Sequence, residues 1–418
     1  MHQTFRERTA PDARLPRRSG TLNRWVRDNY ALHSVDLDDD WVCVSRIESG
    51  FANITCQDID QFVCDEYGDI FDTLPPVHEL PTDNLCRISL IDATKSIESC
   101  SYASPHKYWE AWSTIINDHL HAGCIRPSDS HHVSPLFLIP KADPAALPRW
   151  VIDYRQLNRN VRLDKTPLPQ VDNILADAAK GKYWAKFDMT NSFFQMRMHP
   201  DDIPLTATST PLGLFEWTVM PMGFKNSPRI NQRRMRWALA QYIGKFCHVY
   251  LDDIIIWSSS LQEHQHNLQL ILNAIRSHKL FPSAKKSVFC CMEIKFLGHV
   301  IGHDGIKPDG SKVDRIHKWP VPQSAKEVRR FLGLIRYLGP FLPQLTKHAK
   351  VLTRLIGKDC DKSFPDWRPF HQRAFDSIKS LVTSADCLTT IDHFNPGDNH
   401  IYVTCDASEI GRASLPDP

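Results

Sequence analysis

An acidic pair set between two strongly apolar runs constrains this chain more than any other feature. Residues 246–250 and 254–257 are rich in β-branched and aromatic side chains, and Leu251, Asp252 and Asp253 separate them. Two such runs joined by a short polar tip predict a β-hairpin. Another aspartate, Asp188, lies in a predicted strand at residues 185–189 (AKFDM) with apolar residues on either side. The pattern therefore predicts three carboxylates at the ends of buried strands.

Carboxylates in such an apolar setting are costly unless something neutralises them. Two bound Mg²⁺ ions would do so, because Mg²⁺ prefers hard oxygen ligands and leaves positions open for phosphates. Two metal ions held about 3.5–4 Å apart promote in-line displacement at phosphorus. The alternative, from these residues alone, is that Asp252 and Asp253 form a polar turn and that Asp188 is a surface residue.

The arrangement of the other segments predicts an α+β fold. Helical periodicity is expected over residues 106–121, 262–278, 324–338 and 370–382, with Ser324 as an N-cap. In the first of these helices, Trp109 and Trp112 are expected on the buried face. Strands are expected at residues 135–140, 150–154 and 401–404. Separate helices and short hairpins favour α+β over an alternating βαβ order. Residues 1–60 are predicted to be a poorly ordered N-terminal segment, and residues 61–105 an extended lead-in.

Composition adds several expectations. A formal net charge of +2 does not by itself indicate a nucleic-acid partner. No apolar run is long enough for a membrane span, and residues 1–20 lack the apolar core of a secretory signal. The 12 cysteines show no metal-ligand or disulfide spacing, which favours reduced thiols in an intracellular protein.

Short motifs in a fixed order extend the argument beyond the aspartates. The chain resembles the polymerase region of a gypsy-class LTR retrotransposon Pol polyprotein, from about residue 66 to residue 408. The motifs lie at residues 125–128 (IRPS), 152–158 (IDYRQLN), 167–169 (PLP), 187–195 (FDMTNSFFQ), 220–228 (MPMGFKNSP), 250–253 (YLDD), 296–299 (FLGH) and 331–334 (FLGL).

The resemblance implies a right-hand polymerase. It places the fingers and palm at residues 106–302, the thumb and connection at 303–397, and a truncated ribonuclease H-like start at 398–418. The implied reaction is RNA- and DNA-directed DNA synthesis by two-metal catalysis. It would use dNTPs, a primer on an RNA or DNA template, and Mg²⁺ with Mn²⁺ as a substitute. The expected location is cytoplasmic, in a virus-like particle, and also nuclear.

The resemblance also assigns roles to individual residues. Asp188, Asp252 and Asp253 match the catalytic, metal-binding triad. The residues matched to dNTP binding are Lys141, Arg149, Phe193, Met222 and Gly223, with Phe193 as the ring that excludes a 2′-hydroxyl. The residues matched to primer and template binding are Tyr250, Asn226, Pro228, Phe296, Leu297 and Gly298. Lys285 or Lys286 matches a lysine that protonates pyrophosphate. Four arginines between residues 229 and 236 suit either phosphate contacts or a solvated helix face.

Some residues depart from the family pattern. Asn231 stands where many relatives carry phenylalanine, and Met222 where retroviral enzymes carry glutamine. Asp406 matches the first acidic strand of ribonuclease H, but the later acidic motifs are missing, so hybrid cleavage is not expected. Two alternatives remain: a decayed remnant that only binds nucleic acid, and another two-metal phosphoryl-transfer enzyme such as a nuclease.

Overall fold

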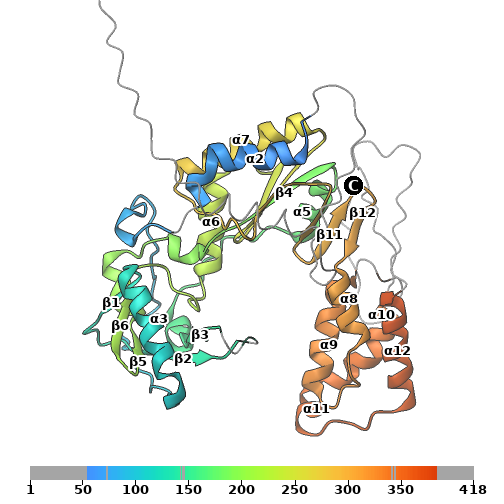
Figure 1. Cartoon of the computed structure of the whole chain (residues 1–418). Helices are drawn as coiled ribbons and strands as arrows, with labels where there is room; N and C mark the ends of the chain where they lie inside the picture. The colour runs from blue at the N-terminus through green and yellow to red at the C-terminus, as the bar shows by residue number, and fades with distance from the viewer. Residues whose placement is uncertain are drawn as a thin grey trace, which may run out of the picture.

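The computed structural model describes residues 54–71, 74–141, 143, 146–339, 342 and 345–383. Three packed units lie side by side and together form an arch (Figure 1). We name them fingers, palm and thumb, after the right-hand arrangement that the sequence predicts. Within the described residues, no helix is both long enough and apolar enough to cross a membrane.

The palm is built on a four-stranded antiparallel sheet with the order β7-β8-β4-β9. Its strands are β4 (Tyr183–Asp188), β7 (Cys247–Tyr250), β8 (Asp253–Ser258) and β9 (Val288–Cys291). Strand β8 lies inside the sheet and is buried on both faces. Ile254 and Ile256 belong to one core, and Ile255 and Trp257 to another. Apolar cover on both faces explains why this strand is a continuous apolar run instead of an alternating one.

Helices on both faces complete the palm. Helices α2 (Cys56–Tyr67), α6 (Ser227–Ala238) and α7 (Leu261–Ser277) supply side chains to the first core. Helix α5 (Val171–Ala178) and a small sheet of β10 (Glu293–Phe296), β11 (His299–Gly302) and β12 (Gly305–Pro308) supply the second. Figure 1 shows α2 and α7 side by side on the outer surface of the arch.

The fingers contain a five-stranded sheet with the order β1-β6-β5-β2-β3. Its strands are β1 (Ile125–Pro127), β2 (Ser134–Ile139), β3 (Arg149–Ile152), β5 (Thr208–Thr210) and β6 (Gly213–Trp217). Helices α3 (Trp109–His121) and α4 (Arg155–Asn160) belong to the same unit, whose core includes Trp112, Tyr154 and Trp217.

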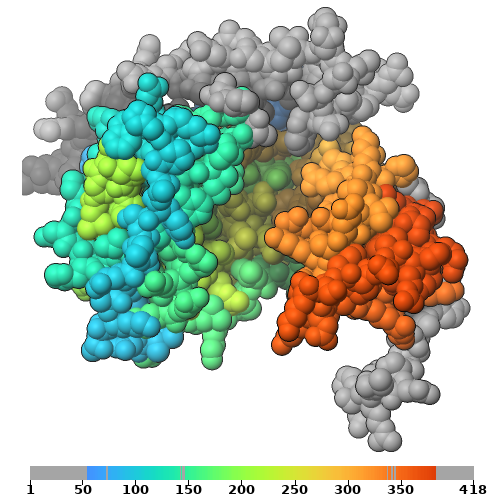
Figure 2. All heavy atoms as spheres, turned by 90° about the horizontal axis from the view of Figure 1, so that it is seen from below, coloured from blue at the N-terminus to red at the C-terminus, as the bar shows by residue number. Residues whose placement is uncertain are grey.

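The thumb is a helical bundle with a core of its own. Its helices are α8 (Gly310–His317), α9 (Ala325–Tyr337), α10 (Leu345–Thr353), α11 (Lys358–Lys362) and α12 (Pro369–Thr383). Phe331 and Phe375 lie at its centre, with ring centroids 4.6 Å apart. Seen from below, the fingers and thumb stand on either side of a groove whose floor is formed by the green and yellow segments of the palm (Figure 2).

Most predicted elements are present. The hairpin forms from β7 and β8, and the predicted helices correspond to α3, α7, α9 and α12. Ser324 caps α9, because its side chain accepts a hydrogen bond from the Glu327 backbone nitrogen. The predicted strand at 401–404 lies outside the described residues.

Two predictions were wrong. Residues 56–67 form a helix that a Thr55–Asp58 capping box starts, so the predicted extended lead-in and disordered segment do not hold there. This helix is stable because Ile59, Val63 and Tyr67 enter the palm core. Trp109 was expected on the buried face of α3, yet 43% of it is exposed.

Candidate active site

The three aspartates lie together at one end of the palm sheet. In the register of β4 and β8, Asp188 is directly opposite Asp253. Asp252 lies at the turn between β7 and β8, and its carbonyl accepts a hydrogen bond of 3.1 Å from the Met189 backbone nitrogen. The hairpin and β4 therefore bring together carboxylates that are far apart in the sequence.

Lysines hold two of these carboxylates. Lys286 Nζ lies 3.1 Å from Asp188 Oδ1, and Lys186 Nζ lies 2.9 Å from Asp253 Oδ1. The second contact has the distance of an ion pair but not the geometry of a hydrogen bond, so buried Asp253 Oδ1 has no hydrogen-bond donor. Burial, reinforced by the charges of Asp253 and Asp188, raises the pKa of Asp252. The three carboxylates therefore carry more negative charge than the two lysines neutralise.

A hard divalent cation suits this arrangement. Asp188, Asp252 and Asp253 are the residues that would hold it, since they offer only oxygen ligands and one buried oxygen lacks a donor. In the described part of the chain, no three acidic, histidine or cysteine side chains converge as a ready metal-binding group. Asp188 and Asp253 each contact a lysine, so binding a cation would require these two side chains to turn away from Lys286 and Lys186.

Helix α6 holds the turn between β7 and β8 through side-chain hydrogen bonds. Leu251 has a φ of +58°, in the left-handed region that non-glycine residues rarely adopt. Gln232 Oε1 accepts a hydrogen bond of 2.7 Å from the Leu251 backbone nitrogen, and Gln232 Nε2 donates one of 3.0 Å to the Val249 carbonyl. The motif comparison did not identify Gln232 or Lys186. Lys186 could have been found, because it lies two residues before Asp188 and so on the same face of the strand.

The turn that carries Phe193 is also held by side-chain hydrogen bonds. Gln195 is buried, and its Nε2 donates to the Thr190 carbonyl at 2.6 Å and to the Phe281 carbonyl at 2.8 Å. Phe193 itself is only partly buried and packs against the fingers core. Its role in excluding a 2′-hydroxyl stays a prediction.

The residues predicted to bind the triphosphate project from the fingers. Arg149 begins β3 and pairs with Ile139 near the end of β2, and Lys141 follows two residues after that strand. Both side chains are exposed, and neither forms an ion pair within the described residues. Two cationic side chains without ion pairs, at one end of the β2–β3 hairpin, suit recognition of phosphate oxygens.

Gly223 lies where the fingers meet the palm. It has a φ of +88°, and a Cβ there would lie 3.1 Å from the Ile152 carbonyl oxygen, so glycine is required. Its own carbonyl accepts a hydrogen bond of 2.9 Å from Asn158 Nδ2. The adjacent Met222 is 41% exposed, and its contact with a dNTP stays a prediction.

Comparisons with known proteins identify the family of this region. Residues 139–301 match the family described as reverse transcriptase (RNA-dependent DNA polymerase). The chain is 35% identical over 364 residues to the Pol polyprotein from transposon opus of Drosophila melanogaster, covering 84% of this chain and 36% of that relative. It is 36% identical over 303 residues to the Pol polyprotein from transposon 297 of the same organism, covering 72% of this chain and 28% of the relative.

The chain carries a retrotransposon reverse transcriptase region. This region spans about a third of the length of the curated polyproteins that it matches. Its fold is that of foamy viral protease-reverse transcriptases. The complex with double-stranded DNA aligns with a TM-score of 0.71 and 25% identity, covering 82% of this chain and 60% of that one. The complex with an RNA/DNA hybrid aligns with a TM-score of 0.71 and 24% identity, covering 81% and 45%.

Two of the residues matched to primer and template binding have buried side chains. Asn226 is buried, with its amide bound to the Arg162 carbonyl at 2.8 Å and the Asp164 nitrogen at 3.1 Å. Phe296 is fully buried in the second palm core. The side chains of Asn226 and Phe296 are therefore packed inside the protein, and the part of their segments in primer or template binding stays a prediction.

The other predicted primer and template residues are more accessible. Leu297 and Gly298, with φ values of +47° and +76°, form the tight turn between β10 and β11. Tyr250, beside the aspartates, and Pro228, at the start of α6, are partly exposed. The side chains or backbone of these four residues are accessible, and their contact with nucleic acid stays a prediction.

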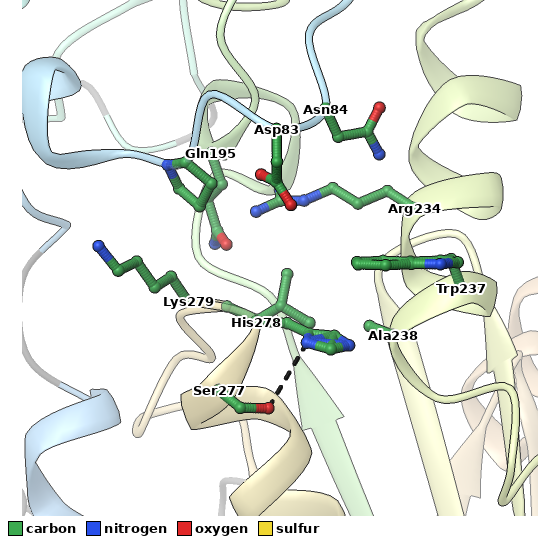
Figure 3. Close-up of a pocket in the computed structure, with 11 residues that line it drawn as sticks. Asp83, Asn84, Gln195, Arg234, Trp237, Ala238, Ser277, His278 and Lys279 are labelled. Atoms are coloured by element: carbon green, nitrogen blue, oxygen red, sulfur yellow. Dashed lines mark hydrogen bonds between the residues drawn. The ribbon is translucent and has the colours of Figure 1, made fainter.

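A cavity of about 280 Å³ lies at the other end of α6 (Figure 3). Arg234, Trp237, Asp83 and His278 line it, and the Trp237 ring stacks on His278 with centroids 4.7 Å apart. Burial lowers the pKa of Arg234 to about 10, which leaves it cationic at neutral pH. None of the three aspartates lines this cavity, but Gln195 of the Phe193 turn does.

Proposed function

We propose that this chain is an RNA- and DNA-directed DNA polymerase that transfers dNMP from a dNTP to a primer 3′-hydroxyl. The observation that carries the proposal is the apposition of Asp188, Asp252 and Asp253 at one end of the palm sheet. This sheet lies between fingers that present uncommitted cations and a thumb across the groove. A nuclease would not require a ring beside the aspartates in the position of Phe193.

The reaction joins the primer 3′-oxygen to the α-phosphorus of the dNTP, and the bond from that phosphorus to the pyrophosphate oxygen breaks. Mg²⁺, when bound, would activate the hydroxyl and stabilise charge on the phosphate oxygens. Lys141 and Arg149 would bind the triphosphate. Of the two candidate lysines, Lys286 would supply a proton to the departing pyrophosphate, since its Nζ lies 3.1 Å from Asp188 Oδ1. Phe193 would exclude nucleotides that carry a 2′-hydroxyl.

Nucleic-acid binding in the groove is part of the proposal. The two foamy viral enzymes that share this fold are described as complexes with double-stranded DNA and with an RNA/DNA hybrid. The β10–β11 turn at Leu297 and Gly298 would contact the primer backbone, since tight turns with positive φ let a backbone approach a ligand closely.

Primer extension on purified protein tests the proposal. A labelled primer is annealed to matched RNA and DNA templates and incubated with dNTPs and either Mg²⁺ or Mn²⁺. Extension that stops in the Asp252→Asn variant supports the polymerase. Duplex binding without extension by the parent chain would favour the remnant that only binds nucleic acid. Shortening of the template without primer growth would favour a nuclease.

A further inference from the structure

Asn231 of helix α6 is fully buried and joins two turns of the candidate active site. Its Nδ2 donates to Ser192 Oγ at 2.7 Å and to the Leu251 carbonyl oxygen at 3.1 Å. Ser192 directly precedes Phe193, and Leu251 directly precedes Asp252. One amide group therefore connects the segment that faces the nucleotide sugar to the segment that carries the catalytic aspartates.

Both turns contain a residue in a rarely populated backbone conformation. Asn191 has a φ of +44° and Leu251 a φ of +58°. Such conformations persist when the surrounding structure holds them in place. At Leu251 the hold is nearly complete, because Asn231 binds its carbonyl and Gln232 binds its amide nitrogen. Adjacent residues of one helix thus fix both sides of the strained turn.

The other end of the same amide shows that this arrangement is not optimised for stability. Asn231 Oδ1 is buried and has no hydrogen-bond partner among the described residues, which is a destabilising situation. Exchanging the amide nitrogen and oxygen would not help, because Oδ1 would then face the Leu251 carbonyl, another acceptor. An apolar side chain would remove the unpaired oxygen, but it would also release both turns.

We propose that Asn231 is a positioning residue that sets the distance between Phe193 and Asp252. The inference rests on the proposed polymerase function and deepens it. Asn231 holds both the turn that carries Phe193 and the turn that carries Asp252. A nucleotide would therefore be correctly placed for reaction only if its sugar fits against Phe193. Loosening the amide link would then lower the turnover of correct dNTPs and relax discrimination against ribonucleotides together.

Three variants test the proposal. Asn231→Leu removes both hydrogen bonds at similar volume. Ser192→Ala removes only the link to the Phe193 turn and leaves the bond to Leu251. Asn267→Leu is the matched control: Asn267 is a buried amide on α7 that donates to Ser258 Oγ at 2.9 Å, outside the site.

Single-nucleotide kinetics give the first readout. Misplacement of reacting groups by about 1 Å costs on the order of 100-fold, so we expect the kcat of Asn231→Leu for dNTPs to fall about 10- to 100-fold. Its KM should change far less, and the preference for dNTP over rNTP should shrink. Ser192→Ala should lose discrimination while keeping most of its kcat. Asn267→Leu should lower the melting temperature without moving either kinetic quantity.

Amide hydrogen exchange gives a second readout that does not depend on polymerase activity. Loss of a hydrogen bond is worth about a factor of ten in local opening. Exchange in residues 190–193 and 250–253 should therefore speed up about tenfold in Asn231→Leu and stay unchanged in Asn267→Leu. Unchanged exchange in both segments would overturn the inference, whether or not the parent chain extends a primer. A parent chain that fails to extend, with exchange as expected, would instead remove the polymerase proposal. Kinetic losses equal to those of Asn267→Leu would also overturn the inference, since they would reflect stability alone.

Discussion

The ion pair between Lys186 and Asp253 leads to a prediction about metal binding. The Nζ and Oδ1 atoms are 2.9 Å apart, and each side chain is 22% exposed. Lys186→Met keeps most of the aliphatic stem over the Phe296 ring but removes the charge. We expect this substitution to destabilise the metal-free protein and to strengthen Mg²⁺ binding, because Lys186 and the cation compete for the same carboxylate.

The magnitude follows from the exposure of the pair. Exposed ion pairs contribute about 0–1 kcal/mol, and removing one partner of a fully buried pair costs about 3–5 kcal/mol. A pair that is mostly but not fully buried should lie near the lower part of that span, at about 1–2 kcal/mol. At about 1.4 kcal/mol per factor of ten, the Mg²⁺ dissociation constant should fall about 5- to 30-fold.

Thermal unfolding followed over a range of Mg²⁺ concentrations measures both effects. A ligand that binds only the folded state stabilises it by an amount that grows with concentration relative to its dissociation constant. Lys186→Met should unfold at a lower temperature than the parent chain without metal, and the difference should close as Mg²⁺ is added. Lys182→Met is the matched control, since Lys182 is exposed just before β4 and has no ion pair among the described residues. Equal Mg²⁺ midpoints for the parent chain and Lys186→Met would refute the competition argument.

Four further predictions concern single residues. Asp252→Asn should abolish dNTP incorporation with the fold intact, because an amide keeps the shape but loses the charge; near-normal extension with a normal circular dichroism spectrum would contradict this. Phe193→Val should raise ribonucleotide incorporation relative to deoxyribonucleotides, and unchanged single-nucleotide discrimination would show that Phe193 only packs. Arg149→Ala should lower kcat/KM about ten- to a hundredfold, mainly through KM, since a hydrogen bond to a charged group is worth ~1.5–3 kcal/mol; an effect below about twofold would place the triphosphate elsewhere. Burial lowers the pKa of His264 from 6.5 to about 4, so its contribution to stability is present above pH 6.5 and is lost as the pH falls toward 4. Urea unfolding at pH 7 and pH 5 should show this loss in the parent chain and less of it in His264→Gln.

The palm hairpin could be predicted because its signal is local. Residues 254–257 are apolar without alternation, and Asp252 and Asp253 separate them from the strand-like run at residues 246–250. A strand that is buried on both faces has few other assignments. The same locality identified Ser324 as a helix cap. Such features depend on neighbours within four residues, which a single sequence contains.

Helix α2 was missed although its signals were in the sequence. Thr55 and Asp58 form a capping box, and Ile59, Val63 and Tyr67 recur at helical spacing. Five acidic residues between 58 and 69 dilute the apolar pattern. The helix depends on partners beyond its own sequence, among them Asn273, which accepts a hydrogen bond of 3.0 Å from the Tyr67 hydroxyl. Tertiary packing of this kind outweighs weak local propensity.

Residue exposure was the least predictable property. Trp109 and Phe296 are both large and apolar, yet 43% of Trp109 is exposed and Phe296 is fully buried. The motif match assigns residues 296–298 to primer binding as a group, and so it assigned Phe296 a contact with the primer. The structure divides the motif, with its ring in the core and its turn at the surface. A family match therefore does not by itself give the exposure of each side chain in a motif.

Helix α6 shows what a sequence could still reveal once one face is known. Ile230, Met235 and Ala238 define its buried face, and Asn231 and Arg234 lie on that same face. The run of charges around them suggested a solvated helix or phosphate contacts. Polar groups on a buried face are expensive unless they are bonded, so each one calls for a specific explanation. Asn231 holds the two turns of the active site, whereas the Arg234 side chain reaches the cavity at the far end of the helix. A polar residue at a core position of an amphipathic helix is thus a sequence signal for a site, even where no motif covers it.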